Sequence, residues 1–148
     1  MMVSTKGRYA LRVMLDLAEY GHGGHVSLAD ISARQEISLK YLEAIAAALS
    51  KAGFLESRRG KTGGYRLARP VNAYTVGSIL KAAEGSLAPV SCLDGGTELC
   101  KRSRHCLTLP VWKELDRRID EYLESVTLED VLEKKVKIGE EFDGAGKQ

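Results

Sequence analysis

The sequence predicts a mainly α-helical fold with one small β-hairpin. Apolar residues recur at helical spacing over residues 5–20, two short capped helical segments follow in residues 27–52, and a basic hairpin pattern occupies residues 54–68. A helix pair followed by such a hairpin is typical of a winged helix-turn-helix domain. A long amphipathic run after residue 107 predicts a further helix suited to pairing two subunits.

Length and charge narrow the class of protein. The chain has 148 residues, enough for one domain with a buried core. Its net charge is only +2, but residues 1–70 hold 11 Lys and Arg against 6 Asp and Glu, whereas residues 113–148 hold 7 against 11. The basic front half indicates a nucleic-acid-binding face. Because no apolar run is long enough to span a membrane and no signal-peptide core is visible, we expect a soluble protein in the reducing cytoplasm.

The first predicted helix begins at Ser4 or Thr5, either of which can cap it, and ends at Tyr20. Its apolar face consists of Tyr9, Ala10, Val13, Met14, Leu17 and Ala18. The glycine-rich turn 21–24 ends the helix. His22 and His25, which lie in or beside this turn, are interpreted as solvated loop residues.

Two further helices form the predicted helix-turn-helix. Ser27 and Asp30 make a capping box for the first, and Ser38 caps the second, which runs to Ala52 before Gly53. The apolar face of the second helix is predicted to hold Leu39, Leu42, Ile45, Ala46 and Leu49, and the opposite face Lys40, Tyr41, Glu43 and Ala44. Many helical bundles contain such a pair, so this pattern alone does not identify a DNA reader.

The hairpin that follows makes the DNA-binding interpretation stronger. Strands are predicted over residues 54–58 and 65–68, joined by the loop 59–64. Its cations are Arg58, Arg59, Lys61, Arg66 and Arg69, opposed only by Glu56. Such a wing reaches phosphates or the narrow minor groove, although a merely solvated basic hairpin is the alternative. A phosphate-binding P-loop is disfavoured, since the glycine spacing does not fit.

All three cysteines lie in one polar loop, at positions 92, 100 and 106. Spare cysteines usually pack in a core as small hydrophobes, and an odd number argues against a disulfide framework. Three soft sulfur ligands close together suit zinc or an iron–sulfur cluster. The spacing contains no C-x-x-C, which disfavours a structural zinc site, and a thiol redox switch aided by Arg102 and Arg104 stays open.

The last helices follow the cysteines. Residues Leu107, Val111, Leu115, Ile119, Tyr122 or Leu123, and Val126 recur at nearly heptad spacing, with Pro110 in the first turn of the helix. This helix is expected to pair with its copy in a dimer, to pack on its own domain, or both. Thr127 and Asp130 form a capping box for a short final helix.

We therefore divide the chain into four parts. Residues 1–84 form the winged helix-turn-helix domain, residues 85–106 the cysteine-bearing loop, and residues 107–138 the dimerisation and C-terminal helices. Residues 139–148, polar and glycine-containing, are expected to be a disordered tail.

The chain resembles the Rrf2-type bacterial transcription regulators, and within that family the iron–sulfur cluster regulators. The resemblance rests on the three cysteines and on the motifs Ser4-Thr-Lys-Gly-Arg-Tyr-Ala10, Leu28-Ala-Asp-Ile-Ser32, Ile37-Ser-Leu-Lys-Tyr-Leu-Glu43, Arg59-Gly-Lys-Thr-Gly-Gly-Tyr65 and Thr127-Leu-Glu-Asp-Val131. It implies a cytoplasmic homodimer, a repressor or other transcription regulator, whose two winged-helix domains bind a DNA operator.

The resemblance also implies an iron–sulfur cluster, of the 2Fe-2S or 4Fe-4S form, held by Cys92, Cys100 and Cys106. The position that holds a histidine ligand in related cluster regulators is Leu109 here. His105 is then the candidate fourth ligand, with Asp94 and Glu98 as carboxylate alternatives. Nitric-oxide-sensing members take a carboxylate from the partner's first helix, but the matching position in this sequence is Arg8.

Side chains on three elements are predicted to contact DNA. Ser38, Lys40, Tyr41 and Glu43 are expected at the major groove or its phosphate walls, where Glu43 can accept from cytosine and Lys40 can reach a phosphate or guanine. The resemblance places Arg59 in the minor groove, beside Gly60 and Lys61. Lys6 and Arg8, at the positive end of the first helix, suit phosphate contacts.

Two other classes of function compete with a cluster-sensing regulator. A zinc-binding or metal-free winged-helix regulator would respond to a thiol redox signal, a small molecule or a partner protein. An enzyme with Cys100 or Cys106 as nucleophile and His105 as base is disfavoured, because adjacent side chains point in different directions. We therefore expect a protein that is not an enzyme.

Overall fold

The computed structural model describes residues 3–95 and 101–139. Its helices are α1 (Thr5–Tyr20), α2 (Leu28–Gln35), α3 (Leu39–Lys51), α4 (Val76–Glu84), α5 (Leu109–Ser125) and α6 (Leu128–Leu132), with 3₁₀ turns at Val71–Ala73 and Ser91–Leu93. The strands β1 (Leu55–Arg58) and β2 (Gly64–Leu67) form the two-stranded sheet. The mainly α-helical fold with a hairpin wing is therefore confirmed. None of the described helices combines the length and apolar character needed to cross a membrane.

Capping side chains set where five of the described helices begin. Ser4, Ser27, Ser38, Thr75 and Thr127 each accept a hydrogen bond from a backbone N–H in the first turn of the helix that follows. A left-handed Gly53, at φ 77°, follows α3. The predicted disordered tail is residues 139–148, of which residues 140–148 lie outside the described residues.

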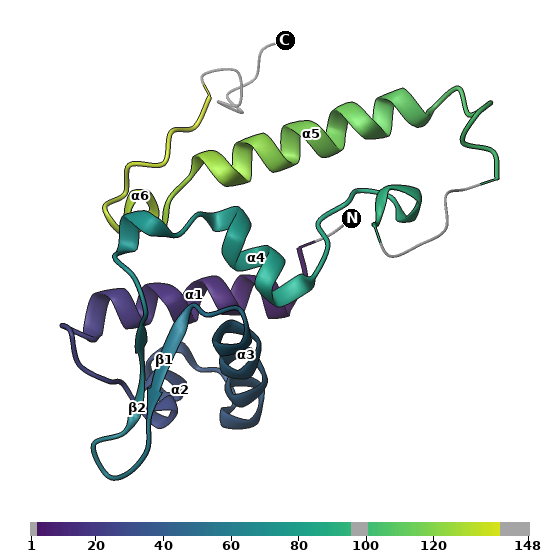
Figure 1. Cartoon of the computed structure of the whole chain (residues 1–148). Helices are drawn as coiled ribbons and strands as arrows, with labels where there is room; N and C mark the ends of the chain where they lie inside the picture. Colours follow the sequence, from purple (N-terminus) through teal and green to yellow (C-terminus); the bar gives the residue numbers. More distant parts are fainter. Residues whose placement is uncertain (1–2, 96–100, 140–148) are drawn as a thin grey trace.

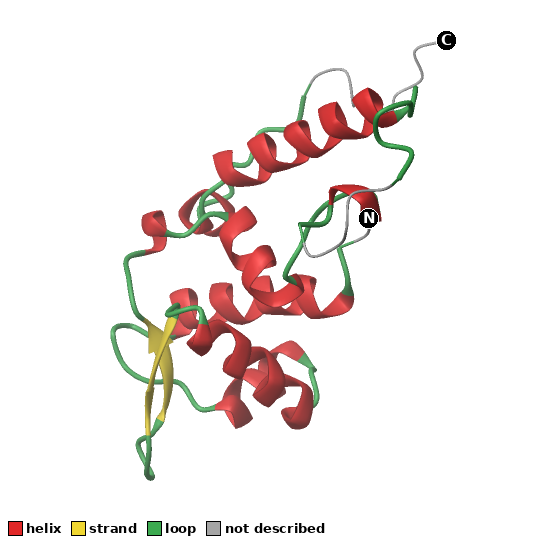
Figure 2. Cartoon of the chain, turned by 45° about the vertical axis from the view of Figure 1, so that its right-hand side comes forward, coloured by secondary structure: helices red, strands yellow, loops and turns green. Residues whose placement is uncertain are grey.

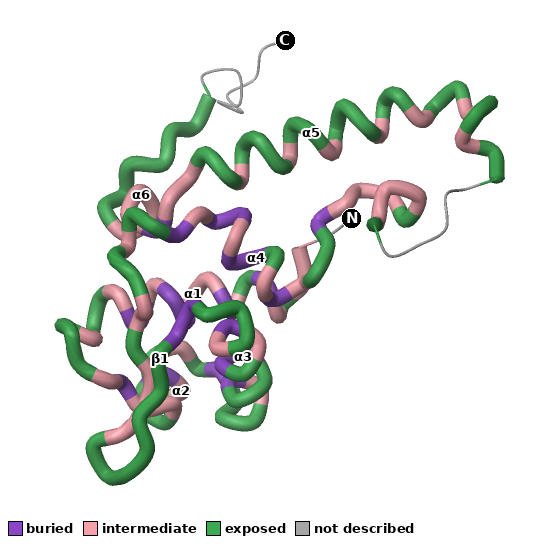
Figure 3. Tube along the Cα trace, viewed as in Figure 1, coloured by how far each residue is buried: buried purple, intermediate pink, exposed green. Residues whose placement is uncertain are grey.

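The core of the winged helix-turn-helix domain, called the reading domain below, lies where α1 meets α2, α3 and α4. Figure 3 shows the buried segments gathered in these helices and at the base of the hairpin. The fully buried side chains include Met14 from α1, Ile31 from α2, Leu42 and Leu49 from α3, and Tyr74 ahead of α4. In Figures 1 and 2, α5 lies on the far side of α4 from the hairpin and α3. The apolar residues of α1–α4 thus build one domain, and α5 is attached to it from outside.

One prediction for α3 is wrong. Leu39, assigned to the apolar face, is 45% exposed, whereas Leu42 is fully buried. Leu39 is the first residue of the helix, and the contact with α1 begins only at Tyr41, whose ring lies edge-on to Tyr9. The Leu39 side chain is therefore presented to solvent beside Lys40.

Asp16 is the one charged residue that is fully buried in the described part of the chain. The Arg34 guanidinium donates to both of its carboxylate oxygens, at 3.0 and 2.8 Å, and Gln35 Nε2 donates to Oδ2 at 2.9 Å. These bonds join α1 to α2, and the bond to Asp16 raises the pKa of Arg34 above its ordinary value. The pair fixes the first helix of the helix-turn-helix against the core.

Removing Arg34 is expected to destabilise the domain strongly. In Arg34→Ala the buried Asp16 carboxylate keeps only the Gln35 donor, and breaking a buried pair in this way costs about 3 kcal/mol of unfolding free energy. Urea unfolding followed by circular dichroism measures this loss. Arg118→Ala removes a solvent-exposed pair with Glu114 and should unfold at the same urea concentration as wild type. Equal midpoints for all three proteins would contradict the importance of the buried pair.

Candidate nucleic-acid interface and cysteine pocket

The outer face of α3 carries the polar residues predicted to meet DNA. Ser38 Oγ accepts from the backbone N–H of Tyr41 at 3.2 Å, so Ser38 has its predicted capping role. Lys40 and Glu43 are exposed. Tyr41 is half-buried instead, with its ring edge-on to Tyr9 at 5.7 Å between centroids. The aromatic pair holds α3 against α1 and leaves only part of Tyr41 accessible.

Leu39 is a residue of this face that the sequence pattern assigned elsewhere. It lies between Ser38 and Lys40 at the start of α3, and its exposed side chain suits apolar contact with a thymine methyl group. Its position in the first turn of a candidate recognition helix was the available signal.

The hairpin presents cations at its tip. Strands β1 and β2 pair antiparallel, with Arg58 opposite Gly64, and Arg58, Arg59, Gly60 and Lys61 are all exposed. Gly60 has φ 103°, which allows the tight turn. The other cations of the hairpin are engaged within the protein. Arg66 binds Glu56 across the strands at 2.7 Å, and Arg69 stacks over Phe54.

Gly64 lets the hairpin dock on the segment before α2. The N–H and carbonyl groups of Tyr65 and Val26 exchange two hydrogen bonds of 2.8 Å. A Cβ on Gly64 would clash with the Val26 backbone, and the φ of 147° also favours glycine. This contact fixes the wing beside the helix-turn-helix.

At the start of α1, Arg8 is exposed and Lys6 is half-buried. Arg8 Nη2 donates to Thr5 Oγ1 at 3.3 Å. Both cations lie in the first turn and a half of the helix, where the backbone N–H groups also favour negative charge.

The structure brings Cys92 and Cys106 to one pocket. This pocket has a volume of about 210 Å³ and is called the cysteine pocket below; it is lined by Cys92, Leu93, Ser103, Arg104, Cys106, Leu109 and Lys113. Both residues are half-buried, and neither forms a disulfide. Leu109, at the position of the predicted family histidine, forms part of the apolar wall. His105 is exposed and is not among the lining residues, and Cys100 lies outside the described residues.

Hydrogen bonding changes the acidity of one of these thiols, that of Cys106. Cys106 Sγ lies 3.4 Å from the Thr108 hydroxyl, and the backbone at Thr108 makes a further contact. These bonds, with a smaller contribution from the charge of Arg102, lower the pKa of the Cys106 thiol. Within residues 3–95 and 101–139, no three His, Cys, Asp or Glu side chains are grouped as a metal site would require.

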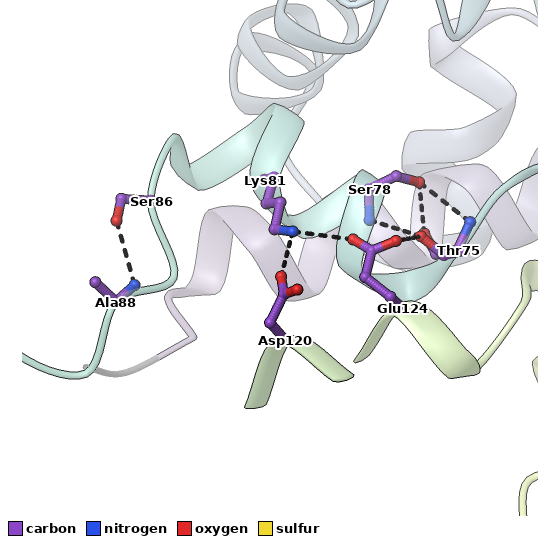
Figure 4. Close-up of polar contacts among 7 residues, drawn as sticks. All are labelled: Thr75, Ser78, Lys81, Ser86, Ala88, Asp120 and Glu124. Atoms are coloured by element: carbon purple, nitrogen blue, oxygen red, sulfur yellow. Dashed lines mark hydrogen bonds and ion pairs between the residues drawn. The ribbon is translucent and has the colours of Figure 1, made fainter. Parts of the chain in front are cut away.

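Helix α5 is held to α4 along one side. Figure 4 shows Lys81 of α4 donating to Asp120 at 2.5 Å and to Glu124 at 3.0 Å, and Thr75 Oγ1 donating to Glu124 at 2.8 Å. The ion pairs raise the pKa of Lys81. A Cβ on Gly77 would lie 2.5 Å from Glu124 Oε1, so a larger residue here would displace the Glu124 side chain.

A second side of α5 has no partner in the described residues. Val111, Leu115 and Tyr122 are 59%, 41% and 54% exposed, and they project within one narrow sector of the helix; they are called the α5 stripe below. By contrast, Leu123 and Val126 pack against the cluster formed by Val76, Leu80 and Leu87. The run that the sequence presents as one seam is thus divided between α4 and solvent.

Comparison of the sequence with known proteins finds transcriptional regulators. A model of the Rrf2 family, described as an iron-dependent transcriptional regulator, matches residues 3–134. The chain is 42% identical over 132 residues to the HTH-type transcriptional regulator IscR of Erwinia tasmaniensis, covering 89% of this chain and 79% of that protein.

Solved structures also resemble the chain. IscR of T. potens has 37% identity and a TM-score of 0.70, with 94% of each chain covered. CymR, described as the global cysteine regulator of B. subtilis, has 36% identity and a TM-score of 0.72, covering 90% of this chain and 98% of that one.

Proposed function

Since the chain belongs to the Rrf2 family of DNA-binding transcriptional regulators, we propose that it acts as a homodimer whose operator binding responds to an iron–sulfur cluster on Cys92, Cys100 and Cys106. The family consists of regulators, so the chain is not an enzyme. The observation that carries the cluster proposal is the placement of Cys92 and Cys106 on the walls of one small pocket.

The chemistry of the cysteine pocket supports a cluster. Thiolates are the ordinary ligands of iron–sulfur clusters, and the bonding around Cys106 favours its thiolate form. Arg104 and Lys113 line the same pocket and would offset the negative charge of a thiolate-bound cluster. When bound, the cluster supplies a group that reacts to iron supply, oxidants or nitric oxide. With Leu109 at the family's histidine position, the fourth ligand has to come from another residue, and His105 remains our candidate.

The described surface supports the proposed DNA contacts. Lys40 and Glu43 on α3 would read the major groove with Ser38 and part of Tyr41, while Arg59, Gly60 and Lys61 would reach the backbone or the minor groove. Lys6 and Arg8 would bind phosphates. Two copies joined through the α5 stripe would present two such surfaces to an operator with two-fold symmetry.

The position of Cys106 suggests how sensing and reading are linked. Cys106 lies three residues before the first residue of α5, and α5 is bound to α4 of the reading domain. A cluster that orders the cysteine segment, residues 85–106, would favour one arrangement of α5 and hence one spacing of the two α3 helices. Operator affinity would then change by up to the factor by which the cluster binds one arrangement of α5 more tightly than the other.

Oxygen-free purification tests the cluster. We expect a brown protein with visible absorbance that contains iron and acid-labile sulfide in stoichiometric amounts. A colourless protein with zinc or no metal would contradict the proposal and favour a thiol switch. That alternative is supported by the lowered pKa of Cys106 and by the likeness to Staphylococcus aureus CymR, 29% identical with a TM-score of 0.70, for which a structure of the oxidized form is known.

Arg59→Ala is expected to weaken binding to a duplex selected from random-sequence DNA by the wild-type protein. Affinity falls as salt rises, and each phosphate that is no longer bound makes this negative slope of log affinity against log salt shallower by about 0.9. The magnitude of the slope, called the salt slope below, should therefore fall by about 2 for a dimer. Fluorescence anisotropy over a range of salt concentrations measures both the affinity and the slope. Arg66→Ala is the matched control, because Arg66 of the same hairpin is paired with Glu56. If the two variants behave alike, the tip of the wing does not contact DNA.

A further inference from the structure

Glu84, the last residue of α4, binds the N-terminus of α1. Its Oε1 atom accepts hydrogen bonds from the backbone N–H groups of Ser4 and Gly7, both at 2.9 Å, and from the Ser4 hydroxyl. The N-cap bond from Gly7 N to Ser4 Oγ is longer, at 3.4 Å. A residue 77 positions away in sequence therefore supplies the shorter bond to this N–H group.

The start of α1 is built to receive this carboxylate. The first turn of α1 has no acidic residue of its own, so Glu84 provides the negative charge that stabilises a helix N-terminus. A Cβ on Gly7 would lie 2.3 Å from Glu84 Oε1, which means that only glycine permits the contact without displacement of the carboxylate. Val3 and Leu11 also pack against the apolar cluster of Val76, Leu80 and Leu87, whose last member lies just beyond Glu84.

The same turn of α1 carries two of the proposed phosphate-binding residues. Lys6 precedes Gly7 and Arg8 follows it. On the other side, Glu84 is followed by Gly85, at φ 85°, where α4 ends and the cysteine segment begins. Lys81, one turn earlier on α4, binds Asp120 and Glu124 of α5 (Figure 4). The last turn of α4 is thus bonded to α5 through Lys81 and to α1 through Glu84.

We propose that Glu84 is a positioning residue for DNA binding, which holds the first turn of α1 so that Lys6 and Arg8 meet the phosphate backbone. The inference rests on the DNA contacts in the proposed function and does not depend on the cluster. Glu84 acts through the backbone of α1 and does not itself touch DNA. Without it, the first turn of α1 loses its strongest cap and the two cations lose their fixed orientation.

The test compares variants by fluorescence anisotropy, with the same selected duplex and range of salt concentrations. We expect Glu84→Ala to lower the salt slope by about 0.9 for each phosphate that is no longer bound, with about tenfold weaker binding at low salt. Glu84→Gln keeps an acceptor oxygen and should bind within about twofold of wild type. Glu19→Ala, an exposed glutamate near the other end of α1, is the matched control and should leave both the slope and the affinity unchanged.

A second route removes the same hydrogen bonds without changing Glu84. Gly7→Ala places a methyl group where the carboxylate lies and should reproduce the lowered slope, which keeps the test decisive if Glu84→Ala does not fold. In the double variant Lys6→Ala/Arg8→Ala the slope should already be low, and adding Glu84→Ala should lower it no further.

Two results would overturn the inference while leaving the proposed DNA contacts intact. Wild-type affinity and slope in folded Glu84→Ala, or in Gly7→Ala where Glu84→Ala does not fold, would show that Glu84 does not position the cations. A further fall in slope when Glu84→Ala is added to Lys6→Ala/Arg8→Ala would show that Glu84 acts elsewhere. A wild-type protein that selects no duplex would instead refute the DNA contacts and this inference together, whereas a protein without a cluster would leave the measurement intact.

Discussion

Cys106→Ser is expected to abolish the visible absorbance of the protein purified without oxygen. Cys106 combines two features of a cluster ligand: a wall position in the cysteine pocket, and a thiol pKa lowered by hydrogen bonding at Thr108 and, to a smaller extent, by the charge of Arg102. Serine preserves the size of the side chain but replaces a soft thiolate by a hard hydroxyl, which binds iron poorly. Iron and sulfide should therefore fall from stoichiometric amounts to traces.

The control for Cys106→Ser lies in the same pocket. Ser103→Ala changes a half-buried pocket residue that carries no soft ligand, so its iron content should equal that of wild type. Circular dichroism and gel filtration of both variants check that the fold and the oligomeric state persist. Full retention of the cluster in Cys106→Ser would exclude Cys106 as a ligand and leave the pocket without its main argument.

Much of the reading domain could be predicted from sequence because its signals are local. The hydroxyl caps at Ser27 and Ser38 and the basic, glycine-rich loop 59–64 each act within a few residues of where they stand. Strand β1 begins one residue later than predicted, since the N–H of Phe54 donates to the carbonyl of Leu49 near the end of α3, and β2 begins and ends one residue earlier than predicted. The apolar periodicity of α3 could not show that Leu39 lies beyond the core, because its burial depends on how far the neighbouring helices α1 and α2 extend beside it.

The contacts that connect the parts could not be read in the same way. Glu84 meets Ser4 and Gly7, and Asp16 meets Arg34, only after helices distant in sequence have packed. Until then these residues look like ordinary charged positions on helix surfaces. The grouping of the cysteines was visible in the sequence, whereas the shared pocket of Cys92 and Cys106 and the wall position of Leu109 follow from how α5 begins. The single apolar seam of α5 likewise divides only when α4 covers part of it.

The α5 stripe leads to the other large effect. Val111→Glu/Leu115→Glu is expected to convert a dimer to a monomer, because the interface would have to bury four like charges without partners. We expect the dissociation constant of the dimer, measured by sedimentation equilibrium, to rise about a hundredfold or more. Operator affinity should fall by a similar factor, since each half-site would then be bound without the effective concentration that the partner provides.

Ile138→Glu is the matched control for this experiment. Ile138 is also a large exposed apolar residue, but it lies outside α5, so the same change of charge should leave the dimer and its operator affinity as in wild type. The stripe variant alters no residue of the cysteine pocket or of the proposed DNA surface, so as a monomer it should keep both its helical circular dichroism and its visible absorbance. A stripe variant that sediments as a dimer and binds the operator with wild-type affinity would show that the two copies meet through another surface.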